Sequence, residues 1–178
     1  MPIVSADLPY RLSGGATNVS PAASLGGDRS TATGGVIVSA ALRALFDDVS
    51  GAEAAAGDIE YRCVYIVNAH ATLTLSDAVL WIASPTTSPS TEFDIQLDPA
   101  AIGAASAIIL TTENDTPDTT ALPPGGWVRP TTKLTGLTIG SLTAGSHKAF
   151  WVRRTVTAGA EAASADTGIL RVQGESPA

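Results

Sequence analysis

The clearest structural signal in the chain is the stretch DIEYRCVYIV, residues 58–67. Its odd-numbered positions carry large apolar side chains, namely Ile59, Tyr61, Cys63, Tyr65 and Val67. An apolar residue at every second position is the pattern of a β-strand, because successive side chains point to opposite faces of a sheet. We therefore expect a strand with one strongly apolar face, ended by Asn68.

Shorter strand patterns lie on both sides of this stretch, separated by turns rich in Gly, Pro, Ser and Thr. We predict further strands over residues 36–38, 78–83, 93–97, 107–111, 127–128, 134–139, 147–156 and 168–172. Residues 36–46 also fit one side of a helix, although we favour a strand that runs into a turn. The polar segments 84–91 and 113–126 are predicted to be loops, and Ala52–Ala56 a single helical turn. Closely spaced strands without a long amphipathic helix are typical of an all-β antiparallel sandwich.

Residues 1–35 differ from the rest, because glycine doublets and prolines divide them and their large apolar side chains follow no period. A segment of this kind buries too little surface to offset its own ordering entropy. We predict an extended N-terminal assembly arm over 1–35, held by neighbouring subunits, and a sandwich domain over 36–178. The alternative is that the segment wraps its own domain. The arm residues expected to bind a partner are Ile3, Val4, Leu8, Tyr10, Leu12 and Leu25.

Composition limits the classes of function. The chain has 178 residues and a formal charge of −7, so its charge disfavours binding to nucleic acid. No stretch of about 18 apolar residues predicts a membrane span, and the first residues lack the pattern of a signal peptide. The single cysteine, Cys63, excludes an internal disulfide framework and a zinc site built from cysteines. We expect a protein made in a cytoplasm.

Two parts of the chain carry a resemblance to a known family. Residues 57–68 have a Gly-Asp turn, a strand and a closing Asn, and the Thr/Leu-rich link 71–75 leads to the next strand at 79–82. Near the C-terminus, LTAGSH at 142–147 leads to Phe150-Trp151-Val152. Over roughly 57–172 the chain resembles immunoglobulin-like modules of bacterial surface and phage proteins. With its Gly/Ala/Ser/Thr-rich N-terminal segment and only two lysines, the whole chain is also similar to small structural proteins of tailed-phage virions.

Motifs for catalysis and cofactor binding are weak. The sequence lacks a Gly-x-Ser-x-Gly elbow and a phosphate-binding glycine loop. Cys63 could pair with His70 or His147, but its place on the apolar strand face favours a buried, inert thiol. Two acidic stretches, 47–53 and 113–118, could hold calcium, although neither has the EF-hand pattern and solvated loops are favoured. We expect no enzyme activity, no metal and no cofactor.

The resemblance implies a non-enzymatic bacteriophage virion structural protein. We expect a capsid decoration or cement protein that binds neighbouring capsid subunits through its arm and forms a homo-oligomer in the assembly, without contacts to nucleic acid or membrane. One alternative is a tail or baseplate protein. Another is a carbohydrate- or cell-surface-binding module, in which the loops 84–91 and 113–127 would present Trp127 as an aromatic platform.

Overall fold

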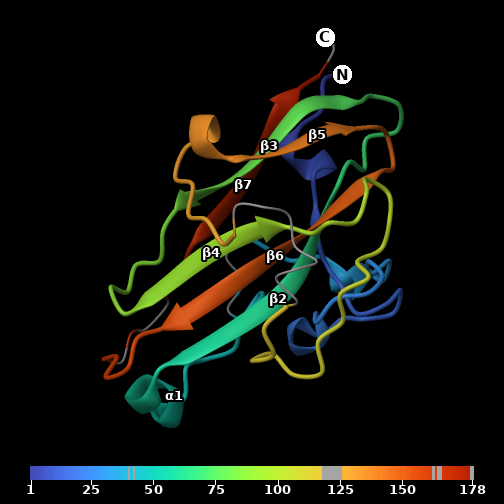
Figure 1. The fold of residues 1–178 in the computed structure, drawn as a ribbon. Helices are drawn as coiled ribbons and strands as arrows, with labels where there is room; N and C mark the ends of the chain where they lie inside the picture. The colour runs from blue at the N-terminus through green and yellow to red at the C-terminus, as the bar shows by residue number, and fades with distance from the viewer. Residues whose placement is uncertain (40, 42, 118–125, 162, 164–165, 177–178) are drawn as a thin grey trace.

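Two antiparallel sheets dominate the computed structural model, which describes residues 1–178 except 40, 42, 118–125, 162, 164–165 and 177–178 (Figure 1). Their strands are β1 Tyr10–Leu12, β2 Asp58–Val67, β3 Leu75–Ser84, β4 Thr91–Leu97, β5 Leu137–Leu142, β6 His147–Val156 and β7 Ile169–Glu175. The orders are β1-β2-β6-β4 and β5-β3-β7. The helices of the described residues are short: α1 is Gly51–Ala56, and the 3-10 turns are η1 Ser5–Asp7, η2 Pro21–Ala23, η3 Thr33–Gly35 and η4 Lys133–Thr135.

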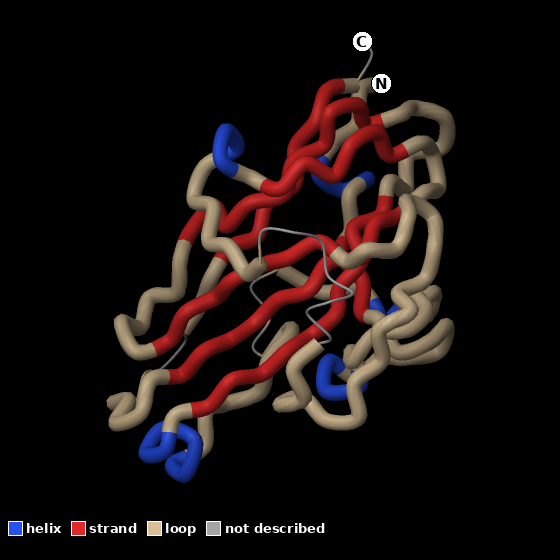
Figure 2. Tube along the Cα trace, viewed as in Figure 1, coloured by secondary structure: helices blue, strands red, loops and turns tan. Residues whose placement is uncertain are grey.

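The long pair β2 and β6 forms the centre of the four-stranded sheet. All ten residues of β2 are in register with β6, and Cys63 lies opposite Trp151. The strand expected from the DIEYRCVYIV pattern is confirmed. The last eight residues of β2 are buried irrespective of the face on which they lie. This sheet is therefore covered on both sides (Figure 2).

The main core lies between the two sheets, as expected for a β-sandwich. Its fully buried side chains include Val64 and Ile66 of β2, Leu80 of β3, Ile95 of β4 and Phe150 of β6. Each sheet contributes alternate residues to this layer, which is the usual way for two packed sheets to form a core. The prediction of an all-β antiparallel sandwich is confirmed at this level.

A second apolar cluster covers the opposite face of the four-stranded sheet. Tyr61, Cys63, Tyr65, Ala149 and Trp151 form its sheet side, whereas Ile108, Leu110, Leu25 and Trp127 come from loops. The N-terminal and 98–116 segments run beside one another here and are joined by a bridge between Gly26 and Ile109 (Figure 1, blue and yellow). The apolar strand face expected from the sequence is therefore buried by loops rather than by the second sheet.

Residues 1–35 pack on the sandwich in this structure, as in the alternative that the segment wraps its own domain, and their contact with neighbouring subunits stays a prediction. β1 adds a strand to β2, and Leu12 is buried. Two glycines allow the following loop to lie close to its neighbours. Gly14 and Gly26 have φ angles of 94° and 108°, and a Cβ atom would lie 2.3 Å and 1.9 Å from the carbonyl oxygens of Ala23 and Ile108. This segment gains its buried surface from the edge of β2 and from the face of β2 that carries Tyr61, Cys63 and Tyr65.

Three of the predicted short strands are not strands of the sheets. Residues 36–38 contribute only a bridge from Val36 to Arg11, and 107–111 only the bridge at Ile109. Val128 makes a bridge to Ile95 of β4. Each of these segments lies along the edge or face of a longer strand. Its apolar pattern therefore indicates that its side chains are buried, and not that the segment forms a sheet strand. The expected strands 78–83, 93–97, 147–156 and 168–172 correspond to β3, β4, β6 and β7. Of the expected strand 134–139, only residues 137–139 belong to β5, because Lys133–Thr135 forms η4.

Candidate functional site

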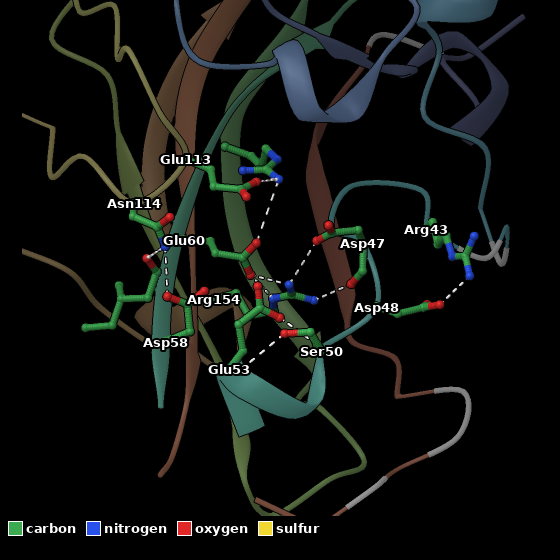
Figure 3. Close-up of polar contacts among 12 residues, drawn as sticks. Arg43, Asp47, Asp48, Ser50, Glu53, Asp58, Glu60, Glu113, Asn114 and Arg154 are labelled. Atoms are coloured by element: carbon green, nitrogen blue, oxygen red, sulfur yellow. Dashed lines mark hydrogen bonds and ion pairs between the residues drawn. The ribbon is translucent and has the colours of Figure 1, made fainter. Parts of the chain in front are cut away.

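A dense group of ionisable side chains, here called the charged cluster, lies at one end of the face of β2 that carries the main core (Figure 3). It consists of Asp47, Glu60, Arg62, Glu113 and Arg154. Glu60 and Arg154 are direct cross-strand neighbours on β2 and β6, and their side chains form an ion pair. Arg62 lies two positions further along the same strand face and pairs with Glu113. The regular alternation of these two strands thus places the three side chains on one face.

Three members of the charged cluster are buried, whereas the Asp47 and Glu113 side chains are 63% and 32% exposed. Glu60 and Arg62 are each 1% exposed, and Arg154 is 5% exposed. The guanidinium carbons of Arg62 and Arg154 lie 5.3 Å and 4.9 Å from the centre of the Phe46 ring. Arg154 also donates a 2.6 Å hydrogen bond to the backbone oxygen of Asp47. The cluster therefore fastens the loop that contains Phe46 and Asp47 to the four-stranded sheet.

Glu60 has the perturbed pKa of the cluster. Burial raises the pKa of its carboxyl to about 7, and the nearby Glu113 adds to the rise, while Arg154 and Arg62 oppose it. Acceptor oxygens of Asp47, Glu60 and Glu113 lie within 4.8 Å of one another, a spacing that can suit a cation. Two guanidinium groups already occupy this space. The arrangement therefore fits an internal ion-pair network better than a metal centre.

The acidic stretches considered as calcium ligands are engaged by the chain itself. Asp48 pairs with Arg43, and Glu53 forms a capping box with Ser50 at the start of α1. Asp115 accepts hydrogen bonds of 2.9 Å and 2.7 Å from the backbone of Thr111 and Thr112. Asp118 lies outside the described residues. The sequence did not indicate that Asp47 and Glu113 meet at Glu60. These residues are far apart in the chain and come together only in the folded sheet.

The candidate cysteine and histidines do not assemble into a catalytic group. Cys63 is fully buried on the face opposite the charged cluster, and burial raises the pKa of its thiol. His147 lies opposite Val67, four residues further along the sheet and thus about 13 Å away. His70 accepts hydrogen bonds from the backbone of Thr72 and Leu73 in the turn after β2. These placements favour the inert thiol that the sequence predicted.

Trp127, the expected aromatic platform, is half-buried against the second cluster. Its ring lies 5.3 Å from that of Tyr61, and the guanidinium of Arg153 lies 5.1 Å from its centre. The loop 84–91 lines a hollow of about 190 Å³ together with Phe93 and Arg129, but Trp127 is not among its lining residues. The loop 84–91 and Trp127 therefore do not share this hollow. Residues 118–125 of the other candidate loop lie outside the described part of the chain.

Five of the six predicted arm contacts serve the protein's own fold. Ile3, Leu8 and Tyr10 pack against the main core, Leu12 is buried, and Leu25 packs in the second cluster. Val4 differs, since it is 54% exposed. As a group these side chains do not form an accessible apolar strip.

The strand edge of β7 is a surface feature that the sequence analysis missed. The edge side chains Ile169, Arg171, Gln173 and Glu175 are exposed, and alternate with partly buried residues. Among the described residues, only β3 pairs with the β7 backbone. The alternation of ILRVQGE over 169–175 was a usable signal for a half-exposed strand, but strand order decides whether such a strand lies at an edge.

The described helices include none long and apolar enough to cross a membrane. Among the described residues, the accessible features are shallow hollows and strand edges, whereas Glu60, Arg62 and Asp98 are buried. Comparison with protein-family models, with curated proteins and with solved structures gave no match to this chain.

Proposed function

We propose that the chain is a non-enzymatic structural protein of a bacteriophage virion that decorates the capsid. The observation that carries the proposal is an unpaired strand edge, β7, on a surface that is poor in charge. A strand edge binds a partner through backbone hydrogen bonds and needs no deep pocket. With 15% charged residues, the chain also leaves few charges to be desolvated when subunits pack together.

The sequence resemblance to immunoglobulin-like modules supports the same proposal. In such modules one sheet contains the first, second, fifth and fourth strands in that order, and the other the third, sixth and seventh. The order β1-β2-β6-β4 is similar to the first sheet, with one strand inserted before β6. In the second sheet β3 is central, whereas the third strand of those modules lies at an edge. We infer a divergent immunoglobulin-like sandwich.

The contact with neighbouring virion proteins is assigned to the surface of the sandwich and not to a free arm. Residues 1–35 supply β1 and part of the second cluster, so releasing them would expose Tyr61, Cys63 and Tyr65 to water. Burying such side chains stabilises a fold by about 1.5–3 kcal/mol each. Retaining this segment is therefore the favoured state of the isolated chain.

Purified particles of the phage that encodes the chain provide the test. Mass spectrometry of the particles should find the chain, and gold-labelled antibodies against it should mark the capsid. Labelling of the tail or baseplate would support the alternative structural role. Absence of the chain from particles that contain all their other structural proteins would contradict a virion role.

The carbohydrate-binding alternative predicts a different result. Retention of the chain on immobilised glycans should then be lost in Trp127→Ala, while the control Leu134→Ala, at an exposed position, should leave it unchanged. We expect no glycan retention by the unmodified chain, because Tyr61 and Arg153 already contact the Trp127 ring.

A further inference from the structure

β7 is the regular, unprotected edge of the three-stranded sheet. None of its residues has a positive φ angle, and it contains neither proline nor lysine, two residues with which proteins commonly protect strand edges. Beyond its C-terminal end, the Ser176 hydroxyl accepts a 3.3 Å hydrogen bond from the Ile3 backbone. The open stretch is therefore Ile169–Glu175.

The other sheet edges are covered or distorted. Ile37 donates a 2.9 Å hydrogen bond to Tyr10 of β1. Val128 exchanges hydrogen bonds of 2.9 Å and 3.1 Å with Ile95 of β4. β5 contains Gly140 at a φ angle of 96°, and its pairing with β3 has two register shifts. Bulges within a strand hinder the addition of another strand to it. The pairing of β7 with β3 also has two register shifts, but in both the extra residue lies in β3, so the spacing of residues within β7 is uninterrupted.

The charges on β7 are complementary to themselves when two copies run antiparallel. In an antiparallel pair, two residues directly opposite each other have their side chains on the same face of the sheet. A two-fold axis that relates the two strands also keeps each residue on its own face. The pair is therefore symmetric only in registers that place one residue opposite its own copy. Centring the pair on Gln173 places Arg171 opposite Glu175 of the second copy, twice by symmetry. Centring on Arg171 places two arginines together, and centring on Val172 places Glu175 opposite the apolar Ile169.

We propose that β7 pairs with β7 of a second copy of this chain, antiparallel and centred on Gln173, to join two three-stranded sheets into one of six strands. Backbone hydrogen bonds supply the attraction, and the two Arg171–Glu175 pairs select the register. Opposite charges directly across a strand pair stabilise it, and like charges destabilise it. Self-pairing concerns the isolated chain and does not rest on a virion role.

Charge exchange tests the register. The dissociation constant of the dimer is measured by analytical ultracentrifugation for the unmodified chain, Arg171→Glu, Glu175→Arg and the double variant. Each single variant creates two like-charge pairs, so we expect association roughly tenfold weaker. The double variant restores opposite pairs and should return to within about threefold of the unmodified chain. Arg43→Glu is the matched control, because it makes the same charge change at an exposed arginine far from β7 in sequence and should leave association unchanged.

Disulfide trapping tests the same geometry without relying on affinity. Gln173→Cys should form a covalent dimer under mild oxidation, since residue 173 faces its own copy. Arg171→Cys should not, because the two copies of residue 171 would be four positions apart, about 13 Å, beyond the reach of a disulfide. Buried Cys63 provides little background reaction. A chain that stays monomeric at millimolar concentration, association insensitive to Arg171→Glu, or trapping through residue 171 in place of 173 would each overturn the proposal.

Discussion

Glu60 combines deep burial with two arginine neighbours, and its ionisation should be visible in the stability of the protein. Its pKa of about 7 in the folded chain lies above the ordinary value of a glutamate, which applies when the chain is unfolded. Between these two values the folded state binds more protons than the unfolded state, so this carboxyl makes stability fall as pH rises. Above pH 7 the ionised carboxylate remains buried at a cost.

We therefore predict that Glu60→Gln flattens the dependence of stability on pH. The free energy of unfolding of the unmodified chain, relative to this variant, should fall by about 2 kcal/mol between pH 5 and pH 8. Urea titrations at a series of pH values measure the difference. His147, whose pKa is lowered by burial, affects both proteins equally and cancels in the comparison. A difference that is constant over this range would show that the arginines fully compensate the burial of Glu60.

Asp98 is a second buried residue whose partners predict a measurable effect. It is fully buried, and its carboxylate accepts hydrogen bonds of 2.8 Å from the Trp151 indole and 2.5 Å from the Ser106 hydroxyl. Asp98→Ala leaves both donors without this acceptor and should destabilise the fold by about 3 kcal/mol. Asp48→Ala, at an exposed ion pair, should change the urea midpoint little. Equal midpoints for the two variants would contradict this account.

At the scale of elements, the loop layer over the four-stranded sheet depends on the close approach of two backbones. Gly26→Ala would place a Cβ atom 1.9 Å from the Ile108 oxygen at a φ angle of 108°. Gly15→Ala is the matched control, because its φ angle is 100° but no atom lies within 4 Å of the new Cβ. Both variants incur the strain of a positive φ angle, about 1 kcal/mol, and only Gly26→Ala adds a steric clash. We expect Gly26→Ala to be less stable than Gly15→Ala by about 2 kcal/mol in urea unfolding, and similar values would show that the two segments can separate freely.

Elements with a strong local pattern were predictable from the sequence, and elements defined by distant contacts were not. The alternation over Asp58–Val67 and the capping residues around Gly51–Ala56 act within a few residues, so both elements were expected. The segment 107–111 has an equally apolar pattern, yet it covers a sheet face in place of forming a ladder. The sequence pattern records that these side chains are buried but not which partner buries them.

The same distinction holds for the candidate site. Cys63 was expected to be buried because its neighbours in the strand are apolar. The charged cluster was not expected, because Asp47, Glu60, Glu113 and Arg154 come from four separate parts of the chain and meet only after β2 pairs with β6. Edge position is likewise a property of the complete sheet, so the open side of β7 could be recognised only from the strand order.

At the scale of the whole molecule, the attachment of the N-terminal segment determines whether the chain unfolds in one cooperative transition or in two. β1 hydrogen-bonds to β2, Ser24 accepts a 2.8 Å hydrogen bond from the backbone of Cys63, and Gly27 accepts one of 2.6 Å from the Tyr65 hydroxyl. The segment is thus attached along most of β2. Limited proteolysis of the isolated chain should leave residues 1–35 intact for as long as the sandwich itself survives.

Leu12→Ala tests whether residues 1–35 and the sandwich unfold together. The side chain of Leu12 is 2% exposed, and its removal should cost about 2–4 kcal/mol, as for other buried leucines. If the segment and the sandwich form one cooperative unit, this loss lowers the unfolding midpoint of the entire chain and leaves a single transition. Val4→Ala, at an exposed position of the same segment, should have almost no effect. Rapid cleavage within residues 1–35 of the unmodified chain, followed by a stable sandwich, would instead mean that the segment detaches on its own and is free to bind a neighbour.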